Sequence, residues 1–268
     1  MSNFGNQNNW NNGQNNGQNN WNDRFGWGNS NTNTAASPAV TSEKAKAFLS
    51  QVMGWMFGAL MLTALVSWVF ASVPALTSLI YVIDPVTGNL AGMKILGWVL
   101  MFLPLVLGMV MNLAFEKLSF GVVVGLFCLY AITFGMSLSV IAFIYAGSII
   151  TEAFLLTAGV FGIMAVAGWV TKADLSRMGT ILMIGLGVAF IAAIINMFVG
   201  SSMLSLIIDI AFVAIFTGLI AFKIQQIKRV GEQVGTSQPK FAVIEALSLY
   251  ITFINLFLTI LRLLGRRE

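Results

Sequence analysis

Charged side chains are scarce in this sequence, and histidine is missing from it. Only 9% of the residues are Asp, Glu, Lys or Arg and 57% are apolar, against about 25% and 45–50% in soluble domains. The missing histidine excludes histidine-based metal sites and Ser-His or Cys-His nucleophiles. The single cysteine, Cys128, forms no intrachain disulfide, and its apolar setting is typical of a small buried hydrophobe rather than a reactive thiol. These features indicate a membrane protein.

Long apolar runs take the place of the missing charge. The run Ile95–Phe115, for example, has no charged residue before Glu116, and a helix needs about 20 apolar residues to cross a bilayer core. Only helices and closed barrels satisfy their backbone polar groups in lipid, and barrel strands would alternate over about ten residues. The sequence therefore predicts an all-α, multi-pass membrane protein with seven spans, near Phe48–Phe70, Ala91–Phe115, Leu118–Ala146, Ile149–Val170, Met178–Val199, Met203–Phe222 and Phe241–Leu264.

The first 42 residues differ from the rest of the chain. They are rich in Asn, Gln and Gly, with a few Trp and Phe residues between them. Such a segment has too little apolar surface to offset the entropy of ordering, so we expect a disordered cytoplasmic tail over residues 1–42. Its aromatic spacing leaves two interpretations open, weak self-association and a free tail. Residues 43–268 then form a single transmembrane domain.

The distribution of Lys and Arg predicts the orientation in the membrane. With the N-terminus in the cytoplasm, the inner segments contain nearly all basic residues and the outer loops only Lys94. This bias accounts for the net charge of +4, so we expect no nucleic-acid partner. Seven spans would, however, place Arg262, Arg266 and Arg267 outside. Either the packed bundle overrides these charges, or the last segment is re-entrant. The Asn-rich tail and the lack of a targeting signal favour a bacterial inner (plasma) membrane.

A few polar residues interrupt the predicted spans and are candidates for function. Asp209 is the clearest, because an ionisable group inside a membrane is costly. Asn112, Asn196 and Asn255 are further polar points on other spans. Together they predict either a polar path for ions or protons, or interhelical hydrogen bonds of about 0.6–2 kcal/mol each. Glu245 lies in the first turn of the last span, where a carboxylate favours the positive helix end.

The most distinctive motifs lie in the second half of the chain. They read TKADLSRMGTILMIGLG from Thr171, FTGLIAFKIQQIK from Phe216 and ALSLYITFINLFLTILRLLG from Ala246, and QVMGWMFGALMLTA from Gln51 accompanies them. From about Lys44 to the C-terminus, the sequence closely resembles the Bax inhibitor-1 family, also called the transmembrane Bax inhibitor motif family. The resemblance implies a central last helix wrapped by six others. It also implies a pH-sensitive calcium leak, gated by two aspartates that share a proton.

This sequence departs from the family at both gating positions. It reads AFKIQ and LYITFINLF, so Lys223 and Thr252 stand where the resemblance implies aspartates. A lysine in place of an acid reverses the local field and repels calcium. Glu245 would lie about 10 Å closer to the inner surface than Thr252, within reach of a long lysine side chain. We therefore hypothesise a salt bridge between Lys223 and Glu245 that closes the path.

Two functions from different classes remain. The first is an ion-handling protein of this family, with calcium or proton conduction altered or lost. The alternative is a membrane-embedded regulator that binds other membrane proteins, such as a quality-control protease. We expect no enzyme, because the chain has no histidine for a serine protease and Asp209 is the only acid deep in a span. Likewise we expect no cofactor or metal site, and the lipid bilayer is the expected surrounding.

Overall fold

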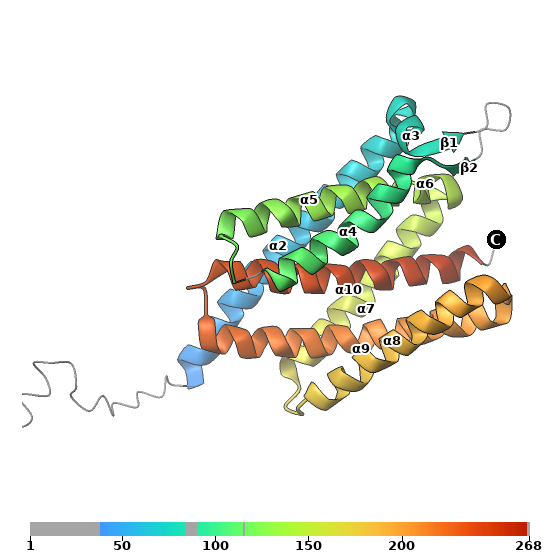
Figure 1. Cartoon of the computed structure of the whole chain (residues 1–268). Coiled ribbons are helices and arrows are strands. Elements are labelled where there is room, and N and C mark those ends of the chain that lie inside the picture. The colour runs from blue at the N-terminus through green and yellow to red at the C-terminus, as the bar shows by residue number, and fades with distance from the viewer. Residues whose placement is uncertain (1–37, 84–89, 115, 267–268) are drawn as a thin grey trace, which may run out of the picture. The chain divides into compact units, whose positions relative to one another are not determined.

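The structure, a computed structural model, describes residues 38–83, 90–114 and 116–266. By its internal contacts the chain divides after Val40, and the bundle is formed by residues from Thr41 onward. Figure 1 shows a helical bundle with one short hairpin. Its elements are α2 (Pro38–Ser72), α3 (Pro74–Ile80), β1 (Tyr81–Ile83), β2 (Leu90–Met93), α4 (Ile95–Leu113), α5 (Phe120–Leu138), α6 (Ile141–Ile144), α7 (Gly147–Val170), α8 (Ser176–Val199), α9 (Ser202–Val234) and α10 (Pro239–Gly265).

Seven helical segments in the described part of the chain are long and apolar enough to cross a membrane. This confirms the predicted all-α, multi-pass fold. Helix α2 begins at Pro38, ahead of the tail boundary predicted at residue 42, and residues 1–37 lie outside the described residues. The third span combines α5 and α6, which are separated by Ser139 and Val140.

Helix α9 is longer than the sequence predicted. The predicted span ended at Phe222, but α9 continues to Val234. Residues 223–234, KIQQIKRVGEQV, contain no apolar run that a hydropathy criterion detects. They do contain good helix formers, and Ile224 and Ile227 are fully buried on one side of the helix. The amphipathic extension therefore packs against the bundle beyond the apolar span.

A hairpin replaces the first turn of the predicted second span. Ala91 was predicted to start a helix, yet it lies in β2, and α4 starts at Ile95. Strand β2 pairs antiparallel with β1, and Tyr81 on β1 is buried and donates a hydrogen bond of 3.1 Å to the carbonyl of Ser137. The hydropathy of residues 90–93 thus reflects a strand that covers the end of the bundle, rather than a helix.

Helix α10 is the central helix of the bundle. It packs against α5, α7 and α9. Of the residues in its 18-residue candidate membrane stretch, 61% are buried, which is the largest share among the candidate spans of the described chain. It is one unbroken helix of 27 residues, or about 40 Å. A helix without a turn cannot return to the side from which it entered, so this geometry favours a full span over the re-entrant alternative.

Candidate functional site

Helices α9 and α10 lie side by side (Figure 1) and contribute polar residues to two cavities. The first has a volume of about 280 Å³, and α4 and α8 contribute to its wall. We call it the Lys223 cavity. Its polar lining consists of Asn112, Lys223, Ser248, Thr252 and Asn255, and among the described residues no Asp or Glu lines it.

The Lys223 side chain is almost completely buried at the α9–α10 contact. The residue is 9% exposed, and its Nζ donates a hydrogen bond to Ser248 Oγ on α10. In the part of the chain that the structure describes, the ion pairs involve Asp174 and Asp209, but not Glu245. The predicted salt bridge between Lys223 and Glu245 is therefore wrong.

The neutral polar side chains of the Lys223 cavity donate to their own helices. Asn112 Nδ2 donates to the carbonyl of Gly108 at 2.8 Å, Asn255 Nδ2 to that of Ile251 at 2.7 Å, and Thr252 Oγ1 to that of Ser248 at 2.9 Å. A carboxamide that donates through its nitrogen still has an oxygen with two lone pairs, and a hydroxyl that donates can still accept. The polar part of the lining therefore offers side-chain acceptors and, among the described residues, one ammonium group.

The polar residues of α10 form a stripe along the whole helix. Their spacing alternates between three and four residues, which keeps them on one face. We call these residues the α10 stripe: Glu245, Ser248, Thr252, Asn255, Thr259, Arg262 and Arg266.

The far end of the α10 stripe borders the second cavity, which we call the Asp209 cavity. Its volume is about 260 Å³, and Asn196, Ser205, Asp209 and Arg262 are its polar lining. Asp209 is 4% exposed, and its two carboxylate oxygens pair with Arg262 at 3.1 Å and Arg266 at 2.8 Å. Two arginines thus pair with Asp209, the acid that the sequence places inside an apolar run.

An aromatic pair stands between the two cavities. Phe212 lines the Asp209 cavity and Phe216 lines the Lys223 cavity. The two rings stack with their centroids 5.8 Å apart and an interplanar angle of 18°. The face of α9 opposite the α10 stripe is therefore charged at Asp209 and Lys223 and apolar between them.

The structure brings most of the predicted site residues together, in two groups. Asn112, Lys223, Thr252 and Asn255 share the Lys223 cavity, whereas Asp209 and Asn196 line the other. Asn196 Oδ1 accepts a hydrogen bond of 3.2 Å from the backbone of Ser201, so it holds the α8–α9 turn. Glu245 is half-buried and lines neither cavity.

Sequence reasoning missed Ser248 and the partners of Asp209. Ser248 lies four residues before Thr252, a spacing that places both on one helix face. Arg262 and Arg266 have the same spacing at the end of α10. A polar stripe was therefore present in the sequence, but nothing in it showed that the stripe faces α9.

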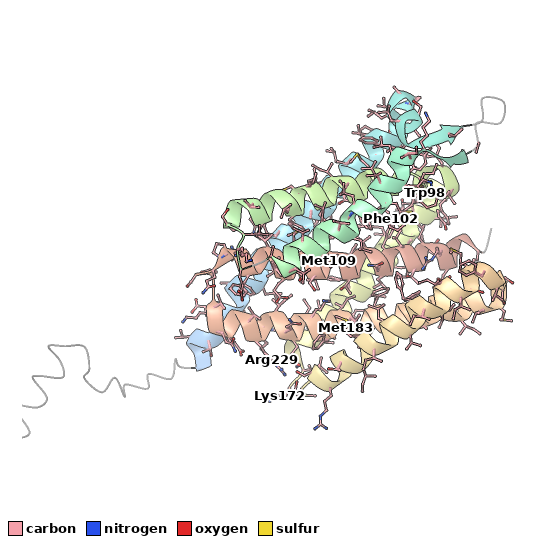
Figure 2. The ribbon with its side chains drawn as sticks, in the orientation of Figure 1. Trp98, Phe102, Met109, Lys172, Met183 and Arg229 are labelled. Atoms are coloured by element: carbon pink, nitrogen blue, oxygen red, sulfur yellow. The ribbon has the colours of Figure 1, made fainter. Side chains whose placement is uncertain are left out.

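A separate polar cluster joins the α7–α8 loop to the extension of α9. Gln225 Oε1 accepts from the backbone of Leu175 at 2.8 Å, and its Nε2 donates to the carbonyl of Ala173 at 2.7 Å. Arg229 pairs with Asp174 and holds the pKa of that carboxyl well below its usual range. Figure 2 shows Arg229 and Lys172 at the same end of the bundle. This cluster fixes the loop and lines neither cavity.

In the part of the chain that the structure describes, seven apolar helices, of which the last is the most buried, define an α-helical multi-pass membrane protein. Residues 45–268 match the family model described as Inhibitor of apoptosis-promoting Bax1, and the chain belongs to the Bax inhibitor-1 family. It is 36% identical over 225 residues to Inner membrane protein YbhL of Escherichia coli K12, covering 82% of this chain and 92% of that protein. It is 33% identical over 237 residues to protein RP147 of Rickettsia prowazekii, covering 88% and 96%. The resemblance identified from the motifs is thus confirmed.

Proposed function

We propose that this protein is an inner-membrane member of the Bax inhibitor-1 family in which the calcium path is closed, with its N-terminus in the cytoplasm. The observation that supports this most directly is the buried ammonium of Lys223, in a cavity that it shares with Thr252. These are the two positions where the family resemblance implies gating aspartates.

The chemistry of the Lys223 cavity is unfavourable for calcium. Calcium is bound by six to eight oxygens, with carboxylates prominent among them, and no described Asp or Glu lines this cavity. A fixed ammonium group repels a divalent cation at close range. A lysine and a threonine also cannot share a proton as two carboxyls do, so the pH switch of an acid pair is lost.

Calcium flux into proteoliposomes between pH 6 and 8 tests this proposal. The wild-type protein should not leak, and the double variant Lys223→Asp with Thr252→Asp should leak with a pH dependence. Lys228→Asp with Thr252→Asp is the matched control, because it makes the same change in charge with a lysine that does not line the cavity. Calcium entry through the wild-type protein would overturn the proposal.

A regulator that binds another membrane protein is the second candidate. Helix α8 favours it, because only 6% of the residues in its 18-residue candidate membrane stretch are buried, and large apolar side chains such as Ile184 and Phe190 are exposed. A photo-crosslinking residue at the exposed Ile184 should then form adducts with a protein in native membranes, and one at the buried Ile220 should not. Adducts with lipid alone would count against this candidate.

A further inference from the structure

The neutral polar residues that line the Lys223 cavity have side-chain oxygens that can act as acceptors. Asn112 and Asn255 each donate one amide hydrogen, and Thr252 donates its hydroxyl hydrogen, to backbone carbonyls of their own helices. All three residues line a cavity in which the Lys223 ammonium is the only charged group among the described residues. Such a set of neutral oxygens is suited to a cation rather than an anion.

We propose that the Lys223 ammonium is a tethered cation, and that it occupies a monovalent-cation site formed by neutral oxygens of α10 and α4. Lysine presents a compact positive charge with three donors on a flexible stem. One of these donors reaches Ser248 Oγ. The Thr252 hydroxyl lies one turn further along α10, and the Asn255 amide follows it on the same face.

Among the described residues no carboxylate lines the Lys223 cavity, and this indicates which class of ion the site would bind. Neutral carbonyl oxygens replace the hydration shell of K⁺ in selective filters, and the side-chain amides of Asn112 and Asn255 have oxygens of the same kind. Divalent ions hold their water more strongly and are usually bound with carboxylates. A vacant Lys223 cavity would therefore accept K⁺ or an ion of similar size in preference to calcium.

The α10 stripe shows along which part of α10 the polar lining continues beyond the site. From Ser248 its neutral members lead through Thr252 and Asn255 toward Thr259, whose Oγ1 donates to the carbonyl of Asn255 at 2.7 Å. The stacked pair of Phe212 and Phe216 then separates the site from the Asp209 cavity. The Lys223 ammonium thus belongs to a cavity with neutral polar residues, and an apolar aromatic pair separates this cavity from the Asp209 cavity.

Two substitutions separate the charge of Lys223 from the space that it occupies. Lys223→Ala removes the ammonium and leaves the site vacant, whereas Lys223→Met removes the charge but fills the same space. Thermal unfolding of each purified full-length protein is measured in KCl and in choline chloride at equal ionic strength. K⁺ should raise the midpoint of Lys223→Ala by about 2–4 °C, and leave the wild-type protein and Lys223→Met unchanged.

A chemical test replaces the Lys223 side chain with a thiol, to which an ammonium group can be attached again. The thiol form is a second variant that lacks the ammonium. Lys223→Cys in a Cys128→Ala background provides a thiol in the cavity, and aminoethyl methanethiosulfonate attaches a new ammonium to it. The K⁺ response should be present in the free thiol and lost after modification. Adding Thr252→Val to Lys223→Ala should likewise abolish the response, because it removes one of the oxygens.

Equal midpoints in KCl and choline chloride for the vacant variants would overturn this inference. An equal response of Lys223→Met would do the same, because K⁺ would then act elsewhere. The inference rests on the proposed function in taking the cavity as a closed ion path. Its readout is binding, so calcium flux through the wild-type protein would refute the proposed function without changing the K⁺ response.

Discussion

At the scale of single residues, two buried charges are stabilised in different ways. Lys223 donates to a hydroxyl, whereas Asp209 has a guanidinium on each carboxylate oxygen. Removing one member of a buried pair is costly, because the remaining charge loses its compensation. The partners of Asp209 are partly exposed, with Arg262 at 50% and Arg266 at 32%, so solvent reduces this cost.

Asp209→Asn is therefore expected to lower the free energy of unfolding by about 1–2 kcal/mol. The amide keeps one acceptor for Arg262 or Arg266 but loses the negative charge that both share. Thermal unfolding of the purified protein measures the change. Asp174→Asn is the control, because Asp174 also pairs with an arginine but is 67% exposed, and it should cause a much smaller loss. An equal loss in the two variants would show that burial of Asp209 is unimportant.

The sequence predicted which residues are unusual better than it predicted their partners. Asp209 and Lys223 were identifiable because a charge stands out in an apolar run. Their partners come from α10, and the register between α9 and α10 is set by side-chain packing that hydropathy does not describe. For this reason the sequence pointed to Glu245 for Lys223, whereas the packed helices bring Ser248 to it.

At the scale of elements, the contact between α7 and α9 depends on a glycine. A Cβ added to Gly168 would lie 2.3 Å from the carbonyl oxygen of Ala221, a backbone atom that cannot move aside. A Cβ added to Gly162, on the same helix, would have nothing within 4 Å. The two positions are therefore a matched pair for testing the closeness of these helices.

Gly168→Ala should lower the stability of the protein by about 1–3 kcal/mol, since it forces α7 away from α9. Gly162→Ala should leave it unchanged or raise it by up to about 1 kcal/mol, because alanine favours the helix. Thermal unfolding and the fraction of monodisperse protein after purification measure both effects. If the two alanines behaved alike, the close α7–α9 contact would be refuted.

The elements that sequence reasoning misjudged lie outside the apolar spans. Hydropathy predicts the number of spans because lipid demands long apolar helices. It does not distinguish residues 90–93, which are apolar and form a strand, from the start of a helix. Nor does it detect residues 223–234, which are polar and helical, because their stability comes from buried positions such as Ile224 and Ile227.

At the scale of the whole molecule, the pairing of Asp209 weakens the objection to an outer C-terminus. The positive-inside rule counts basic residues near the ends of spans, and Arg262 and Arg266 opposed a seventh full crossing. Both are bound to Asp209, so part of their charge is compensated within the bundle. With seven spans and a cytoplasmic N-terminus, the α8–α9 turn and the C-terminus are expected on the outer side.

Two serines at opposite ends of α9 test this orientation. Ser202 begins α9 and Ser237 lies in the α9–α10 turn, and both are exposed. In a Cys128→Ala background, Ser202→Cys should react with a membrane-impermeant maleimide in intact spheroplasts. Ser237→Cys should react only after lysis, because the proposed orientation places its turn in the cytoplasm, together with the basic residues of the α7–α8 loop. The reverse pattern would invert the orientation, and labelling of both in intact cells would mean that α9 does not cross the membrane.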